Sequence, residues 1–533
     1  MARREETLRW LEWDPTGPAL NSFEDTSSGG TGPLTVDYAQ NVDTRFGVAC
    51  LGPLTNTVTL TAAGGTGTTA IGFAMSGTMN ATLFGYVIRG TKWAKVQISN
   101  MTLISDGTET ALAEAATSIV YTKNAAGTPV QVIAIGMDNT AYRCITAVGA
   151  GTTDTHSANN ESIINRIMAL ATPSGTYQRM VGLGRSGAAN TGMNTVRYNI
   201  LSTTVDADAS AWGTTATISG KDITFTGFGL DENFWILGTD EGPFYLDSEF
   251  ATFRELMPEI GRNASNCVGM GRWSYLGLLI PLLRGLRPQK GLQSYGAVGP
   301  ERYANNTSPV QGRVQGVTGD EQWAYLPVYN IVTGDTYLCA VRPRQPEDWH
   351  NNLLSYYPIA WYQTTVVGFI EDIDTANGTR TSPTTVLGLG TDMGYITRGA
   401  IPREIDDTNY RFAASGTEFL TETRRDLDVV KDVQLVTLTT TGCSATQTVT
   451  VKLQVEDILT GALRTAITVG APIASNGFHV LRIPEQDPVS GTRVKPQLVF
   501  ATASSSASPQ VIGKVRVGYH ATELLDRENR SVA

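Results

Sequence analysis

Short runs of β-branched and aromatic residues, broken by glycine, make up most of the chain between residues 46 and 425. In "WILGTDEGPFYLD" (residues 235–247), two apolar runs flank a Gly-Thr-Asp-Glu-Gly hinge. Short runs bounded by turn residues predict β-strands joined by tight hairpins. Long helical blocks rich in Glu, Lys and Leu are missing from the sequence. The pattern therefore predicts an all-β fold.

The glycine hinges recur along the chain. Strand-like runs break at glycines about fifty residues apart, a spacing close to the ~40–50 residues of a β-propeller blade. The hinge glycines are Gly90, Gly136, Gly184, Gly238, Gly285, Gly334 and Gly390. The sequence therefore predicts a β-propeller, with seven blades favoured over six or eight.

Another short β run precedes most hinges, and we assign it to the innermost strand of a blade. The clearest of these runs begin near Ile71, Ser118, Ile223, Gly312 and Thr365. They are rich in small and β-branched residues, as expected where seven strands crowd around one axis. Trp235 and Trp323 fall in the following strand, where large rings would fill the wedge between blades. We expect both tryptophans to be buried.

The hinge around Asp240 either holds a ligand or is a tight turn. The same Leu-Gly-Thr-Asp-x-Gly order returns around Asp392. Gly allows the positive φ of hairpin turns, and Asp can accept hydrogen bonds from nearby backbone. We interpret both hinges as turns between the second and third strands of a blade, with a ligand-holding loop as the alternative.

After about residue 425 the apolar residues alternate with polar ones. Val449, Val451, Leu453 and Val455 show this alternation, which is typical of a half-buried antiparallel strand. Several such runs predict a small antiparallel β-sandwich. The predicted division of the chain is an irregular N-terminal arm at 1–45, a β-propeller at 46–425, a β-sandwich at 426–521 and a polar tail at 522–533.

Charge and composition exclude several classes of function. The net charge is −10, which argues against broad nucleic-acid binding because that function needs a basic face. The N-terminus lacks the apolar core of a signal peptide, and the longest apolar run, Tyr275–Leu283, is shorter than the ~20 residues of a membrane-spanning helix. We therefore expect no membrane insertion.

The cysteines are few and far apart. They are Cys50, Cys144, Cys267, Cys339 and Cys443. An odd number without a C-x-x-C pair indicates neither a disulfide framework nor a zinc site. We expect buried free thiols and folding in a reducing compartment.

Catalytic motifs are sparse. The four histidines stand in neither an H-E-x-x-H nor a G-x-S-x-G context, and "GRSGAANTG" lacks the Lys-Ser/Thr of a phosphate-binding loop. The acids of "EDIDTANGT" (residues 371–379) are mis-spaced for an EF-hand. Propeller sialidases repeat an S-x-D-x-G-x-T-W turn, and residues 238–243 lack its Thr-Trp ending. We predict no catalytic residue, no cofactor and no metal site, and a chain that is not an enzyme.

An aromatic segment at residues 342–363 is the first candidate surface. Its residues Trp349, His350, Tyr356 and Tyr357 stand among Arg, Asp and Asn. Rings that stack on sugars beside groups that hydrogen-bond to hydroxyls are typical of glycan-binding sites. The alternative is that these rings pack onto the propeller.

The N-terminal arm holds the second candidate surface. Leu8, Trp10, Leu11 and Trp13 have few apolar neighbours along the chain. Aromatic anchors are typical of interface hot spots, so we predict that these residues dock on a neighbouring subunit. Under this hypothesis, removal of residues 1–35 leaves a folded propeller that no longer incorporates into its assembly. The alternative is that the arm folds back onto its own propeller.

Three stretches, mainly within residues 36–400, carry a resemblance to a known family. The first is "SPVQGRVQGVTGDEQWAYLPVYNIVTGDTYLCAVRPR" (residues 308–344) with the following "WHNNLLSYYPIAW". The second is "FWILGTDEGPFYLD" with "FRELMPEIG", within residues 234–261. The third is "VDYAQNVDTRFGVACLGP" (residues 36–53). These stretches resemble β-propeller tail proteins of tailed bacteriophages, and the third resembles the lead-in of tail-nozzle propellers.

The resemblance implies a structural role in the virion tail, as a propeller disc of the nozzle or tail tip. Such a protein would be made in the host cytoplasm and would bind other phage tail proteins and further copies of itself. The C-terminal sandwich looks like an accessory module of virion proteins. The alternatives are a tail protein that binds a host receptor or surface glycan and, more distantly, a propeller glycoside hydrolase.

Overall fold

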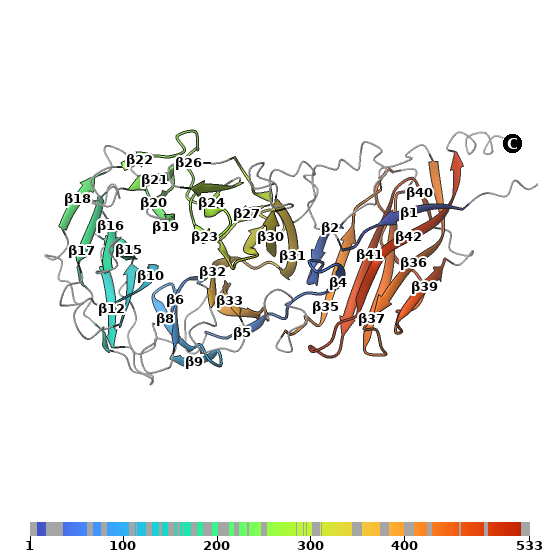
Figure 1. Cartoon of the computed structure of the whole chain (residues 1–533), viewed down its shortest axis with the longest axis horizontal. Coiled ribbons are helices and arrows are strands. Elements are labelled where there is room, and N and C mark those ends of the chain that lie inside the picture. The colour runs from blue at the N-terminus through green and yellow to red at the C-terminus, as the bar shows by residue number, and fades with distance from the viewer. Residues whose placement is uncertain are drawn as a thin grey trace, which may run out of the picture.

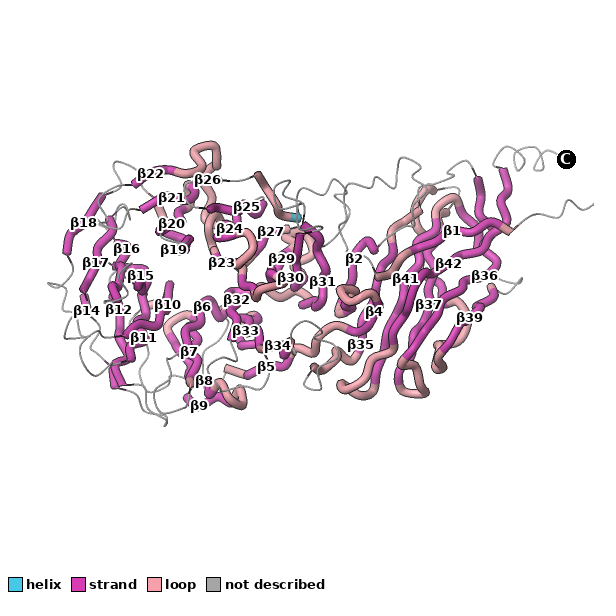
Figure 2. Tube along the Cα trace, in the orientation of Figure 1, coloured by secondary structure: helices cyan, strands magenta, loops and turns pink. Residues whose placement is uncertain are grey.

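The protein is described from a computed structural model, in which a ring of small sheets lies beside a two-sheet sandwich (Figure 1). Strands and loops make up nearly all of the described chain (Figure 2). The described residues are 8–16, 36–60, 68–75, 83–105, 112, 114–123, 131–137, 141–147, 155–156, 160–161, 164–171, 178–184, 195–200, 213–217, 223–231, 234–246, 253–283, 285–290, 293–294, 296–300, 310, 312–343, 354–373, 383–398, 410–423, 429–457, 460–483 and 489–523.

Seven antiparallel sheets follow one another around the ring, so the fold is a seven-bladed β-propeller, as predicted. Blade one contains β6 (Ala70–Met75), β7 (Phe84–Arg89), β8 (Lys92–Gln97) and β9 (Thr102–Ser105). Blade two contains β10 (Ala116–Lys123), β11 (Gln131–Met137), β12 (Ala141–Ala147), β13 (Thr155–His156) and β14 (Asn160–Glu161). Blade three contains β15 (Ile164–Ala171), β16 (Gln178–Gly184), β17 (Thr195–Ile200) and β18 (Gly213–Thr217). Blades four and five contain β19 (Phe225–Asp231), β20 (Phe234–Thr239), β21 (Gly242–Leu246) and β22 (Phe253–Glu255); and β23 (Gly271–Trp273), β24 (Gly277–Leu282), β25 (Gly285–Lys290) and β26 (Gln293–Ser294).

Blade seven is completed by a strand from the start of the chain. Blades six and seven contain β27 (Arg313–Val314), β28 (Thr318–Gly319), β29 (Ala324–Tyr329), β30 (Thr336–Pro343) and β31 (Leu354–Tyr362); and β32 (Val367–Ile373), β33 (Thr384–Leu389), β34 (Asp392–Thr397) and β5 (Asn56–Val58). The last of these, β5, pairs antiparallel with β34 and forms the outer edge of the blade. The ring is therefore closed by segments more than 300 residues apart in the sequence.

The predicted innermost strands fall in five different blades. The runs near Ile71, Ser118, Ile223, Gly312 and Thr365 coincide with or directly precede β6, β10, β19, β27 and β32. These strands approach one another closely: a Cβ on Gly368 would lie 2.0 Å from the Ala70 carbonyl oxygen. Crowding at the axis thus explains the small residues of these strands. Trp235 and Trp323 are each 4% exposed, which confirms their predicted burial.

Four hinge glycines lie at turns between second and third strands with positive φ, as predicted. They are Gly90 (48°), Gly285 (131°), Gly334 (77°) and Gly390 (56°). The other three lie within or at the end of second strands. They are Gly136 in β11, Gly184 in β16 and Gly238 in β20.

The second module is a sandwich of two antiparallel sheets. The first sheet has the order β2 (Val36–Gln40), β35 (Ser415–Leu420), β41 (Val494–Thr502), β37 (Gln447–Val455) and β38 (Ile467–Thr468). The second has the order β3 (Val42–Asp43), β4 (Val48–Leu51), β42 (Gln510–Glu523), β36 (Val429–Thr441) and β39 (Gly477–Arg482), with β1 (Arg9–Trp13) beside β42 and β40 (Val489–Gly491) beside β36.

The predicted domain boundaries are wrong at both ends of the sandwich. The described residues of the N-terminal region form strands of this module, because β1 pairs with β42 and β2 with β35. β4 and β35, predicted to lie in the propeller, also belong to the sandwich. β42 extends to Glu523, two residues into the predicted tail, and residues 524–533 lie outside the described residues. Strand pairing across nearly the whole chain leaves no local sequence signal.

The sandwich contacts blade six through β2 and β3, which lie beside β31 (Figure 1). The Trp361 N–H donates to Asn41 Oδ1 (2.8 Å), and the Tyr38 ring meets the Tyr337 ring edge-on at 6.4 Å. Arg45 and Asp43 form a buried ion pair at 2.8 Å, with the guanidinium 5.1 Å from the Trp323 ring centroid. Backbone, aromatic and charged contacts therefore join the two modules.

Candidate binding channel

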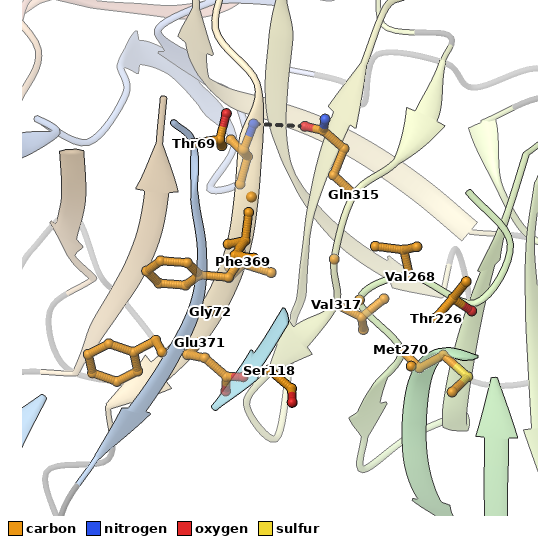
Figure 3. Close-up of a pocket in the computed structure, with 18 of the residues that line it drawn as sticks. Thr69, Gly72, Ser118, Thr226, Val268, Met270, Gln315, Val317, Phe369 and Glu371 are labelled. Carbon is orange, nitrogen blue, oxygen red and sulfur yellow. Dashed lines mark hydrogen bonds between the residues drawn. The ribbon is translucent and has the colours of Figure 1, made fainter. Parts of the chain in front are cut away.

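A cavity of about 680 Å³ lies along the axis of the propeller. The first strands of blades one, two, four, six and seven line it, together with the segment that leads into the first strand of blade five. Figure 3 shows side chains from several blades around this space, including Thr226, Val317 and Phe369. The lining is mostly apolar or hydroxylated, and its charged groups among the described residues are Arg313 and Glu371.

Glu371 extends from the innermost strand β32 of blade seven. Its side chain is exposed within the cavity, and the surrounding inner strands partly desolvate the carboxyl group. This desolvation, reinforced by the neighbouring Asp372 carboxylate, raises the pKa of Glu371 to about 7. Glu371 can therefore hold or release a proton near neutral pH.

Asp372 points away from Glu371, as alternation along a strand requires. Both of its carboxylate oxygens accept hydrogen bonds from Arg398 Nη2 (2.6 Å each). Arg398 also contacts the Asp320 carboxylate, and its guanidinium lies 4.9 Å from the Tyr325 ring centroid. This buried charge cluster links blades six and seven and leaves Glu371 as the acid that faces the cavity.

Arg313 stands at the start of blade six, where the cavity opens. Its Nη1 donates to Ser265 Oγ (2.5 Å), and its guanidinium lies 5.8 Å from the Tyr329 ring centroid. Desolvation lowers the pKa of Arg313, because partial burial disfavours its charged form. Within the described part of the chain, no carboxylate pairs with this guanidinium.

Gln315 connects blades six and seven near the same opening. Its Oε1 accepts a hydrogen bond from the Val367 N–H (3.1 Å; dashed line in Figure 3). Its Nε2 is buried without an acceptor among the described residues. The amide therefore fixes the spacing of two inner strands at the rim of the cavity.

The described lining of the cavity contains few acidic groups. Most glycosidases use two carboxyl groups, about 5–9.5 Å apart, on either side of the scissile bond. Among the described residues that line the cavity, Glu371 is the one carboxylic acid. A cluster of three or more potential metal ligands is likewise not found in the described part.

The predicted docking residues of the N-terminal arm lie on β1 or just before it. Leu11 is 6% exposed and Trp13 is fully buried in the sandwich core, where Trp13 Nε1 donates to the Thr421 carbonyl (2.8 Å). Their prediction as free docking residues is wrong, because alternation on β1 turns both toward the core. Trp10 is 45% exposed, and it lies with Leu8 over the backbone of Gly518.

The aromatic segment does not form the predicted glycan surface where it is described. Tyr356 is fully buried and donates from Oη to the Val298 carbonyl (2.7 Å). Tyr357 is 5% exposed and meets the Trp323 ring edge-on at 5.6 Å. The prediction is wrong for these two tyrosines, which pack within the propeller, whereas Trp349 and His350 lie outside the described residues.

The two acidic hinges are turns between second and third strands, as predicted, but their carboxylates bind groups outside the turn. Asp240 Oδ1 accepts from the Thr224 N–H (2.9 Å) and its Oδ2 from Arg262 Nε (2.6 Å). Asp392 Oδ1 accepts from the Leu60 N–H (3.0 Å). Each carboxylate therefore holds neighbouring backbone within the same protein.

The sequence interpretation missed Glu371 and Arg313 as channel residues. Their signal is a charge within a predicted innermost strand that is otherwise apolar or small, as in "TVVGFIED" and "GRVQGVTG". Four cysteines, Cys50, Cys267, Cys339 and Cys443, are free and buried, as expected. Among the described residues, no helix has the length and apolar character needed to cross a membrane.

No protein-family model and no curated relative matches the sequence. Among solved structures, the chain is similar to an exo-β-1,3-galactanase from Phanerochaete chrysosporium, at 10% identity and a TM-score of 0.29 over 88% of this chain and 99% of that one. It is also similar to Saccharomyces cerevisiae Sqt1, at 11% identity and a TM-score of 0.39 over 62% and 97% of the two chains. For the Dos1 propeller the values are 10%, 0.34, 59% and 74%. Such similarities concern the fold alone.

Proposed function

We propose that this protein is a structural component of a tailed-phage virion, a propeller disc of the nozzle or tail tip. In this role it binds other tail subunits and further copies of itself rather than catalysing a reaction. The resemblance of residues 36–53, 234–261 and 308–344 to phage tail propellers supports the proposal. The structural observation that carries it is the connection between the two modules.

The start of the chain is built into sheets completed by later segments. β1 pairs with β42 in the sandwich, and β5 pairs with β34 in blade seven. The buried pair of Arg45 and Asp43 lies where the sandwich meets blade six. An accessory module joined in this way is held by a packed interface, in contrast to one on a flexible linker. Such a connection suits a subunit that must keep its shape within an assembly.

The channel offers a second candidate function, the binding of a host surface glycan. The cavity of about 680 Å³ falls within the size range of small-ligand sites, and Glu371 can hydrogen-bond to a sugar hydroxyl there. Burial of Tyr356 and Tyr357 removes two of the aromatic residues that the sequence suggested for this role. Retention on an array of host-surface oligosaccharides, lost in Glu371→Gln, would favour this candidate.

The structural role can be tested on purified particles of the phage that encodes this chain. Antibodies against the whole chain, carried on gold, should mark the tail end of intact particles in negative stain. Mass spectrometry of the same particles should find the chain as a stoichiometric component. Gold on the head alone, or absence of the chain from purified particles, would overturn the proposal.

A further inference from the structure

The two faces of the propeller differ in their connections. In each blade the first strand runs away from one face and the second returns to it. The turn between the second and third strands therefore lies on that face, as does the connection to the next blade. We call this face of the propeller the turn face. The Ala70 N–H donates to the Gly390 carbonyl (2.7 Å) and the Ala116 N–H to the Gly90 carbonyl (2.7 Å), which joins strand starts to these turns.

Exposed apolar side chains gather on the turn face. Six of the seven most exposed large apolar residues described in the propeller lie there: Ile71 (41%), Val268 (38%), Leu283 (42%), Ile331 (73%), Val332 (88%) and Val366 (37%). The seventh, Tyr275 (40%), lies in the turn between β23 and β24, on the opposite face. Gathering on one face is typical of an interaction surface, whereas scattered apolar residues are ordinary.

The most exposed of these residues stand on a turn with a defined shape. Asn330 Oδ1 accepts from the backbone N–H groups of Val332 (2.8 Å) and Thr333 (3.2 Å). The Gly334 N–H donates to the Asn330 carbonyl (2.8 Å), and Gly334 has a φ of +77°. Ile331 and Val332 are thus presented in a pre-organised turn, which lowers the entropy lost on binding.

The same turn is joined to the connection between blades six and seven. Asp335 Oδ1 accepts from the Thr364 N–H (2.8 Å), and Thr336 Oγ1 donates to the Thr365 carbonyl (2.6 Å). Val366 follows directly in this connection. The exposed side chains of Ile331, Val332 and Val366 therefore belong to one hydrogen-bonded group of loops on the turn face.

A cation lies beside this group. The Arg313 guanidinium lies over the ring of Tyr329, the residue that precedes the Asn330 turn. Asp335 is acidic, but it uses Oδ1 on the Thr364 backbone, and Arg262 is paired with Asp240 in blade four. Arg313, which has no carboxylate partner among the described residues, is complementary to an incoming acid.

We propose that the turn face at blades six and seven is the docking site for a segment of a second tail protein. That segment places apolar side chains against Ile331 and Val332 and a carboxylate on Arg313. Ile331 and Val332 supply the desolvated centre of the contact, and the Arg313 guanidinium fixes the position of the bound segment along the turn face. This inference rests on the proposed function in taking the occupant to be a virion protein.

Incorporation of full-length variants into particles tests the surface. A phage lacking the gene is complemented with wild-type chain, Ile331→Ser/Val332→Ser, Arg313→Glu, or the matched control Tyr275→Ser on the opposite face. We expect both turn-face variants to lower incorporation by about tenfold or more, as loss of an interface hot spot does. Tyr275→Ser should incorporate like wild type, with melting temperatures confirming that every variant folds. Normal incorporation of both turn-face variants would overturn the docking site and leave the proposed function intact.

A crosslink identifies the occupant and separates the two proposals. A photoreactive amino acid at position 332 of the full chain is activated in infected cells, and the adduct is sequenced by mass spectrometry. An adduct to another phage-encoded protein, at a segment with an acidic residue among apolar ones, supports the docking site even if the wild-type chain is missing from mature particles and the proposed function fails, whereas an adduct only to a host protein overturns the docking site. An adduct only to a second copy of this chain, to nucleic acid or to lipid, or no adduct, overturns the docking site.

Discussion

The propeller and the sandwich are both antiparallel β structures, but they use the sequence in opposite ways. Blade one takes β6 to β9 from one stretch of chain, whereas the sandwich pairs Arg9 with Tyr519 across about 500 residues. Blade seven combines both modes, because β5 returns from the start of the chain. The comparison shows that neighbouring modules with similar secondary structure can differ almost completely in contact order.

The apolar cores of the two modules are also organised differently. One apolar cluster fills the sandwich and includes residues from β1, β4, β35, β37, β41 and β42. The propeller has several smaller clusters, such as the one shared by Trp323, Tyr357 and Leu387 between blades six and seven. A defect should therefore spread through the sandwich but stay near its own blades in the propeller. Four predictions test this difference.

The largest effect is expected for Trp13→Ala. Trp13 is fully buried and donates a hydrogen bond to Thr421, so its loss should lower the free energy of unfolding of the sandwich by about 3–5 kcal/mol. Trp10→Ala on the same strand is the matched control and should cost less than about 1 kcal/mol, because Trp10 is 45% exposed. Urea unfolding, with hydrogen exchange of β42 and β36 amides, measures both. Equal costs for the two variants would contradict the assignment of β1.

Trp323→Ala should have a somewhat smaller and more local effect. Removal of this ring leaves a cavity beside Tyr357 and should cost about 3 kcal/mol. Hydrogen exchange should accelerate in blades six and seven and stay unchanged in blades one and two. Equal acceleration around the whole ring would show that the propeller core responds as a single unit.

Glu418→Gln should stabilise the sandwich at alkaline pH. Glu418 is fully buried in β35, and neither carboxylate oxygen has a hydrogen-bond partner among the described residues. Burial, with a smaller contribution from Asp14, raises its pKa well above the ordinary value. The folded protein therefore keeps a proton that the unfolded chain releases, so wild-type stability falls as pH rises above about 4.3 and stops falling beyond the folded pKa.

The glutamine variant has no proton to lose at this position. At pH 8 we expect it to be more stable than wild type by about 1–3 kcal/mol, whereas at pH 4 the two should nearly coincide. Thermal melts across this range measure the difference. Glu371 acts in the same sense in both proteins. Because its folded pKa is about 7, it lowers the stability of both as the pH rises from about 4.3 to about 7. A pH-independent difference between the proteins would contradict the protonated state of Glu418.

The smallest effect is expected for Asp240→Asn. The amide retains an Oδ1 acceptor for the Thr224 N–H but loses both the charge and the acceptor oxygen opposite Arg262, whose side chain is 51% exposed. Exposed ion pairs contribute about 0–1 kcal/mol, so unfolding and particle incorporation should stay nearly unchanged. Arg262→Ala serves as the control for the ion pair. A large loss of ligand or metal binding in Asp240→Asn would restore the ligand-loop interpretation.

The sequence predicted the elements whose contacts are local, and it failed where a strand pairs with a distant part of the chain. Gly90, Gly285, Gly334 and Gly390 mark hairpin turns, where local chemistry determines local structure, and their spacing indicated seven blades. The strand nature of residues 9–13 depends on β42, which no local pattern reveals. For the same reason Trp13 suggested an exposed anchor, although alternation with Leu11 places both in a core.

The candidate site was less predictable than the fold. The channel arises where first strands from separate blades converge, so Arg313 and Glu371 become parts of one cavity only through the ring. Tyr356 and Tyr357 suggested a surface because aromatic residues beside polar ones serve both sugar binding and interior packing. The sequence holds the chemistry of these residues, whereas long-range packing decides which side chains meet solvent.

The pairing of β1 with β42 and of β5 with β34 sets an order of events on the ribosome. The first sixty residues emerge early, yet blade seven gives β5 its partner only when β34 has been made, and β1 waits for β42. At about 5–20 residues per second, β1 spends roughly half a minute or more of synthesis without its partner strand. During that time Trp13 and Leu11 lack their native core. Nascent chains of this protein should therefore depend on chaperones that shield apolar N-terminal segments until translation ends.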